Sequence, residues 1–309
     1  MAQIRDRSRS TILILLILPT AVGWYRSSVR FEPAMVDVEF LYHQHLNDTD
    51  RRLLQRVVGA DVPVSVALGS SAMEATVFGS DARRELSVGV SPFLAFATAV
   101  HRTATALETA TFVEERWAPR IRIPVFDVAA LRTLLSDPAR RYFLVELLAS
   151  YTRVASGVTW TRTARGWRRR RFSEMDPGRL AELLEVVEPS EHPGIYRRLG
   201  DLALFLLGVF PDHPPALTSG AATDRLLRVS GMGAAEGTDD LDTKALLELL
   251  GARCYRAAVA SAVAAGQPVT TTLAVAGHMA EHFRDARRVL NAVTDRYLFP
   301  VREQWFGAR

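Results

Sequence analysis

The sequence has a single cysteine, Cys254, and a single lysine, Lys244, among its 309 residues. One cysteine excludes an intrachain disulfide and any zinc site that several cysteines would form. All of the 38 cationic side chains except Lys244 are arginines, as a GC-rich coding bias would produce, so any cationic surface here has to use arginine. No apolar run reaches the roughly 20 residues that cross a bilayer as a helix.

Positive charge is concentrated in one short segment. The formal net charge of the chain is +4, and residues 1–34 contribute +3 of it. The segment Arg162–Arg171 holds six arginines and no carboxylate, which leaves −5 for the rest of the chain from residue 35 onward. That balance argues against nucleic-acid binding by the whole surface. Such a dense run of one sign needs an anionic partner, nearby acids or solvent around it.

The composition is that of a globular protein, with 48% hydrophobic and 23% charged residues. The pattern predicts a mainly α fold with a few short strands: an α+β N-terminal part, an arginine-rich β-hairpin, a buried central helix and a C-terminal helical hairpin. We expect an extension at residues 1–34, an α+β helix-rich domain at 35–211 with the hairpin at 158–172, a flexible linker at 212–240, and a helical hairpin at 241–309 packed on the domain.

The N-terminal extension allows three interpretations. Three arginines precede a charge-free stretch with an apolar run at residues 12–18 and small residues after it, which is the outline of a secretory signal or a membrane anchor. Met35 opens a new globular pattern, so the earlier residues could instead come from an over-extended reading frame, or form a buried core element. We expect a cytoplasmic protein, with membrane anchoring or export through residues 11–25 as the alternative.

Several helix starts follow from capping residues. Ser91, Asp137 and Asp176 each precede a proline, and a cap followed by proline is typical of a helix N-terminus. Residues 62–78 alternate apolar residues with Gly and Ser and are interpreted as strand or irregular structure. Residues 120–126 alternate like a short edge strand.

Apolar patterns predict the central and C-terminal helices. Residues 195–210 are apolar on all sides from Leu202 onward, which indicates a buried helix that Pro211 ends. Two long helices, 242–265 and 273–298, follow the linker. The second carries a heptad stripe and should pack on the first as an antiparallel hairpin.

The arginine-rich segment is predicted to be a β-hairpin. Residues 158–163 alternate with β-branched side chains, and Ala164-Arg165-Gly166 fits a three-residue turn with glycine at positive φ. That turn pairs Val158 with Phe172, Trp160 with Arg170 and Arg162 with Arg168. Arginine and tryptophan together can contact phosphates and stack on bases. The polyanion- or partner-binding candidates are Trp160, Arg162, Arg165, Trp167, Arg168, Arg169, Arg170 and Arg171.

Metal-binding patterns are weak. His278 and His282 lie four residues apart on an expected helix, but their order departs from the metalloprotease His-Glu-x-x-His pattern. His43 and His45 would share one side of a strand, yet no third ligand is evident. The acids at 239–242 precede a helix and are expected to cap it.

No catalytic motif stands out either. Asp201 lies inside the apolar central helix beside Arg197 and Arg198, where a buried carboxylate needs a partner, so we expect an internal ion pair. An acid/base role for Asp201 is the alternative. Ser70 and Ser71 lack the surroundings of a nucleophile.

The sequence therefore predicts a non-enzymatic binding, regulatory or scaffolding protein. It would engage a protein partner or a second copy through the hairpin or the C-terminal helices. One alternative is nucleic-acid or other polyanion binding through residues 162–171, and another is a helical enzyme of unknown reaction. No cofactor is expected.

Overall fold

The computed structural model describes residues 37–79, 90–118, 121–154, 156–163, 166–211, 220–229, 231 and 242–299. Within these residues the fold is mainly α with a few short strands, as the sequence predicts, and the strands form two two-stranded antiparallel sheets. The N-terminal extension, the turn residues Ala164 and Arg165, and most of the expected linker lie outside the described residues.

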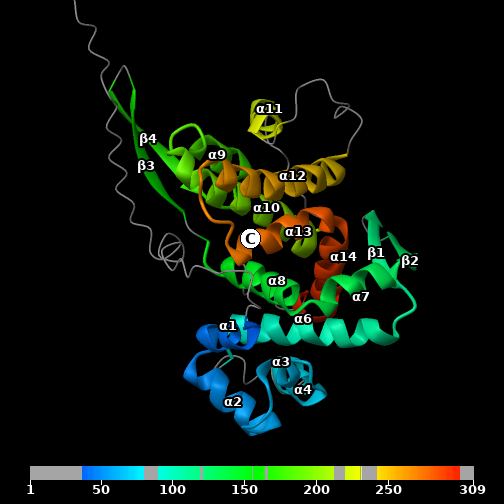
Figure 1. Ribbon diagram of the computed structural model, residues 1–309. Coiled ribbons are helices and arrows are strands. Elements are labelled where there is room, and N and C mark those ends of the chain that lie inside the picture. Colours follow the sequence, from blue (N-terminus) through cyan, green and yellow to red (C-terminus); the bar gives the residue numbers. More distant parts are fainter. Residues whose placement is uncertain are drawn as a thin grey trace, which may run out of the picture.

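The N-terminal half consists of helices packed around the long helix α6. Its elements are α1 (Val38–His45), α2 (Asp48–Val58), α3 (Val64–Leu68), α4 (Ser71–Phe78), α6 (Pro92–Thr109), β1 (Val113–Ala118), β2 (Ile121–Val125), α7 (Val128–Ser136) and α8 (Pro138–Ser150). The helix start at Ser91-Pro92 is confirmed, because the Ser91 hydroxyl accepts the backbone N–H of Leu94 at 3.1 Å. In Figure 1 the helices α2–α4 lie on one side of α6, and α7 and α8 on the other.

The C-terminal half is built around α10, the buried central helix that the sequence predicts. Every residue from Leu199 to Val209 is buried, and α12 and α14 pack most closely against this helix. The elements are β3 (Ser156–Thr163), β4 (Gly166–Ser173), α9 (Pro177–Leu183), the 3₁₀ turn η2 (Pro189–Glu191), α10 (His192–Val209), α11 (Gly220–Val229), α12 (Thr243–Ala264), α13 (Thr271–Glu281), α14 (Phe283–Val293) and the π-helical turn η3 (Thr294–Leu298).

Residues 64–78 form two short helices, so the prediction of strand or irregular structure there is wrong. The buried residues of α3 include Val64 and Leu68, and those of α4 are Met73 and Val77. Each pair has the i, i+4 spacing of a helix face. A helix start at Ser70, whose hydroxyl accepts the Met73 N–H at 3.1 Å, separates the two patterns. If the helix start at Ser70 is overlooked, the apolar residues of the two helices look like one irregular alternation.

The last predicted helix is interrupted at His282, whose backbone leaves the helical region with φ −113° and ψ 25°. The break divides it into α13, which packs on α12, and α14, which packs mainly on α10. The heptad stripe is nevertheless buried throughout, at Ala276, Met279, Phe283, Ala286, Leu290, Val293 and Tyr297. The hairpin with α12 therefore involves mainly the first half of the predicted helix.

Part of the expected flexible linker is ordered. Residues 220–229 form α11, and its Leu226 and Leu227 are buried. Arg225 of this helix bridges Glu182 and Glu185, with both N–O distances at 3.0 Å. The linker prediction is therefore wrong for 220–229, because a Pro-rich stretch before this short helix and a Gly- and Ala-rich stretch after it suggested a linker throughout.

Glycines let α10 and α12 approach closely. A Cβ at Gly200 would lie 2.5 Å from ring carbons of Tyr255. A Cβ at Gly251 would overlap the ring of Phe283 and lie 2.9 Å from the Cβ of Ala203. Both contacts are shorter than van der Waals packing allows. The close packing of α10 and α12 therefore requires glycine, which has no Cβ, at both positions.

A group of buried charges ties β1 to the C-terminal helices. Glu115 accepts hydrogen bonds from Arg287 at 2.5 Å and from Arg288 at 3.0 Å. Lys244 lies 3.4 Å from the same carboxylate. Arg287 has a side chain only 2% exposed and also bonds Glu248 at 3.2 Å. Strand β1, which the sequence did not predict, is thereby held against α12 and α14.

A buried histidine lies where α1 meets α6. His101 is 5% exposed, and its Nε2 lies 2.9 Å from the hydroxyl of Tyr42. Burial and the nearby Arg141 lower the pKa of His101 to about 3, although a hydrogen bond with the backbone of Ser65 opposes this. His101 is therefore neutral in the folded protein at ordinary pH.

We expect the free energy of unfolding to fall by about 2 kcal/mol between pH 7 and pH 5. The unfolded histidine binds a proton near pH 6.5, whereas folded His101 does so only near pH 3. The unfolded state binds more protons in that window, so stability falls as the pH falls. Burial also lowers the pKa of His45, which acts in the same direction. Urea denaturation at several pH values measures how the free energy of unfolding depends on pH. His101→Gln should remove most of this dependence between pH 7 and pH 5. An unchanged dependence would exclude His101 as the cause.

Candidate partner-binding hairpin

Strands β3 and β4 form the hairpin that the sequence predicts, but in a different register. Trp160 lies opposite Arg169, and Arg162 lies opposite Trp167. The predicted pairs, Trp160 with Arg170 and Arg162 with Arg168, are wrong by one residue. The last pair of the ladder is Thr163 with Gly166, so two residues join the strands instead of three. Because the length of the turn sets the register, one residue fewer shifts every pair.

The observed register changes which residues share a face. Cross-strand partners lie on the same face of a ladder, and residues alternate between faces along each strand. One face, which we call the Trp–Arg face, contains the positions of Val158, Trp160, Arg162, Trp167, Arg169 and Arg171. The opposite face contains those of Thr159, Thr161, Arg168, Arg170 and Phe172. The predicted register would have placed the two tryptophans on opposite faces.

The hairpin extends away from the helical body as a narrow arm (Figure 1). Of the helices, α9 packs closest to it, against β4. Each strand has eight residues, which corresponds to an arm about 26 Å long. Gly166, with φ +111°, starts β4 at the tip, where the left-handed region favours glycine.

One arginine of the central helix bonds to the chain on both sides of this arm. Arg198 donates to the Ser150 hydroxyl at 2.8 Å and to Glu174 at 3.0 Å. Its guanidinium also lies 3.9 Å from the ring centroid of Tyr151. Ser150 and Tyr151 precede β3, and Glu174 directly follows β4. The sequence suggested Asp201 as the partner of Arg198 and missed the anchor residues Ser150 and Glu174, because no local pattern brings 150, 174 and 198 together.

The neighbouring turn of α10 holds the predicted Asp201 site. Arg197 lies 3.6 Å from Asp201 and 3.2 Å from Glu146, and the Tyr255 hydroxyl donates to Asp201 at 2.9 Å. Arg198 bonds Glu174 instead of Asp201. Burial raises the pKa of Asp201, although Arg197 and Arg198 oppose this. Asp201 is 4% exposed, so this carboxylate joins helices and is not open to a substrate.

The histidine candidates lie apart from this network. His278 is exposed on α13, whereas His282 lies at the break after it, with Nδ1 3.7 Å from Asp285. His43 and His45 are in α1, so the strand interpretation for them is wrong, and His45 stacks on Phe93 with ring centroids 4.8 Å apart. Across the described segments, no group of three or more His, Cys, Asp or Glu side chains could hold a metal ion.

Asp242 and Ser70, weighed from the sequence as a helix cap and as a nucleophile, both lie at helix starts. Asp242 caps α12, accepting the Ala245 N–H at 2.6 Å, whereas residues 239–241 lie outside the described part. Ser70 caps α4. Both side chains therefore stabilise helix starts.

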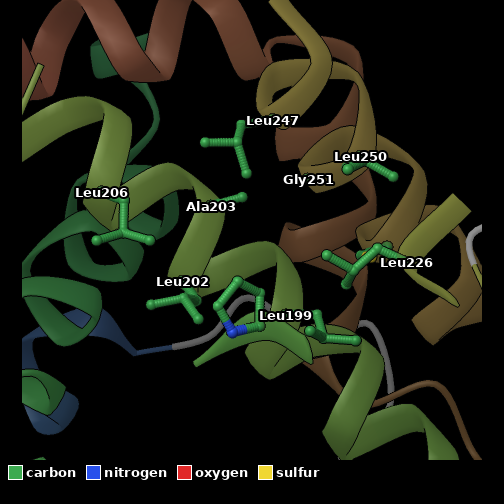
Figure 2. A pocket seen from close by; sticks show the side chains of 10 residues that line it. Leu199, Leu202, Ala203, Leu206, Leu226, Leu247, Leu250 and Gly251 are labelled. Atoms are coloured by element: carbon green, nitrogen blue, oxygen red, sulfur yellow. The ribbon is translucent and has the colours of Figure 1, made fainter. Parts of the chain in front are cut away.

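A small cavity lies between α10, α11 and α12. Figure 2 shows leucines from these helices around it, among them Leu202, Leu226 and Leu250. Its volume is about 10 Å³, far below the several hundred Å³ of a typical ligand site. This cavity is a packing defect and does not accommodate a small molecule.

No protein-family model, curated protein or solved structure matches the chain. Among the helices that are described, none has the length and apolar character needed to cross a membrane. The apolar segment 11–25 lies outside the described residues.

Proposed function

We propose that the chain is a non-enzymatic binding protein that engages an anionic partner through the β3–β4 arm. The observation that carries this proposal is the projection of the arm from the helical body, because the arm holds five arginine positions in its two described strands. Arginine is suited to carboxylate and phosphate partners, since its guanidinium donates several hydrogen bonds in a planar fork.

Several acids of the body are already paired within the body. Glu74 bonds Arg102 at 2.7 Å, and Glu146 and Glu115 pair with arginines of α10 and α14. An arm folded back on the body would have to compete with these pairs. This supports a partner outside the chain as the source of negative charge.

Retention on immobilised heparin, a polyanion without bases, tests the proposal. We expect the protein to elute at well above physiological salt, and the four-alanine variant of Arg168–Arg171 to elute near the void, because each lost phosphate- or sulfate-type contact removes part of the salt-dependent affinity. A matched variant replaces four exposed body arginines, Arg52, Arg56, Arg228 and Arg256, with alanine. Equal loss in the two variants would show that net charge, and not the arm, causes retention.

A further inference from the structure

The Trp–Arg face carries both aromatic and cationic residues, next to one another along and across the strands. Along β3, Trp160 is followed two residues later by Arg162, and along β4, Trp167 is followed by Arg169. Across the ladder each of these tryptophans lies opposite an arginine. Positions on one face repeat about every 7 Å along a strand and about 5 Å across it. Within these four positions, aromatic and cationic residues therefore alternate both along and across the strands.

We propose that the Trp–Arg face binds single-stranded nucleic acid, with Trp160 and Trp167 stacking on bases and the arginines contacting phosphates. This inference rests on the proposed function, since it names the anionic partner of the same arm. Non-specific single-strand binders combine a cationic track for the backbone with aromatic side chains on which successive bases stack. The alternation of Trp and Arg positions supplies both on one face.

The tryptophans favour a single strand over other polyanions. In a duplex the bases are already stacked on one another, and a β-ribbon reads them through hydrogen bonds to base edges in the major groove. A sulfated polysaccharide or an acidic protein surface offers anions but no bases. Two of the five tryptophans in the chain lie on this one face, and unpaired bases offer each of them a stacking partner.

The anchor helps to preorganise this face. Arg198 bonds Ser150, the last residue of α8, and Glu174, the residue after β4, so the chain on both sides of the arm is tied to the central helix. A fixed platform loses less conformational entropy on binding than a disordered one. The arm is therefore suited to bind a flexible strand.

Fluorescence anisotropy with three labelled probes tests the inference: a thymidine oligonucleotide of about 20 nucleotides, an abasic oligonucleotide of the same length, and a duplex of the same length. We expect the thymidine strand to bind at least tenfold more tightly than the abasic strand, because stacking contributes about tenfold per base. Alanine at both Trp160 and Trp167 should reduce binding of the thymidine strand to the abasic level and leave heparin retention intact. Alanine at Thr159 and Thr161, on the opposite face, should change binding less than about threefold.

A conservative variant distinguishes the loss of stacking from misfolding of the arm. Phenylalanine at both tryptophan positions keeps a stacking surface, so it should retain binding of the thymidine strand within about fivefold. Equal affinity for the thymidine and abasic strands, or tighter binding of the duplex, overturns the inference even where heparin binding persists. Failure to bind both heparin and the thymidine strand overturns the proposed function as well.

Discussion

Replacing Glu115 with alanine should lower the free energy of unfolding by about 3–5 kcal/mol. The carboxylate is 8% exposed and is shared by Arg287, Arg288 and Lys244. Without it, three cations remain clustered, and Arg287 keeps only Glu248 as a carboxylate partner among the described residues. An uncompensated buried charge is costly, since neither water nor a counter-ion replaces the lost partner.

The neighbouring residue of the same strand provides the control. Glu114 pairs with Arg122 at 2.9 Å, but the two side chains are 53% and 43% exposed, so Glu114→Ala should cost less than about 1 kcal/mol. Chemical denaturation of both variants measures the difference, and Glu115→Gln should give an intermediate value because it keeps the shape but loses the charge. Similar values for Glu114→Ala and Glu115→Ala would contradict the assignment.

Acid should remove the same interaction. Burial tends to raise the pKa of Glu115, but Arg287 and Arg288 dominate and lower it to about 2. Because its folded pKa is below its unfolded value, the stability from Glu115 is present above about pH 4.5 and falls as the pH drops toward 2. This window lies below most of the one assigned to His101, so a pH series separates the two groups.

Replacing Gly251 with valine should destabilise the protein by about 3 kcal/mol or more. The new side chain would collide with the Phe283 ring and with Ala203, whose helix α10 lies against α12. Separating the helices to relieve the clash would open the packing around the buried central helix. The gain in helix propensity on replacing glycine with valine is less than about 1 kcal/mol, so overpacking dominates.

Gly277→Ala, on α13, is the matched control. A Cβ there would lie 3.2 Å from a methyl group of Val259, which is the end of a side chain and can shift slightly. We expect a change of less than about 1 kcal/mol in either direction, since the propensity gain offsets the tighter contact. Thermal unfolding of both variants shows the contrast. A Gly251→Val protein as stable as the parent would mean that α10 and α12 are less closely packed than described.

The sequence predicts elements better than it predicts their pairing. Ser91-Pro92 and the all-apolar run from Leu202 are local signals, because a cap and a fully buried helix each have a recognisable composition. The hairpin was also predicted, yet its register was wrong, since a two- and a three-residue turn both fit Ala164-Arg165-Gly166. One residue of turn length decides whether the two tryptophans share a face.

The anchor and the Glu115 network could not be predicted, for a different reason. Arg198 joins residues that precede β3 to one that follows β4, and Glu115 meets Arg287 from 172 positions away. Such partners are selected by tertiary packing and leave no spacing in the sequence. Asp201 was the exception, because a carboxylate inside an apolar helix with Arg197 four positions earlier already indicates an internal pair.

Lys244 has a practical consequence. A protease that cleaves only after lysine has one cleavage position in the chain, and it lies in the first turn of α12, with the amine held 3.4 Å from Glu115. Cleavage there requires this turn to open, so the rate of appearance of two fragments reports the opening equilibrium of the segment that joins β1 to the helical core. A chain with a single lysine thus contains its own reporter of local unfolding, without any engineered label.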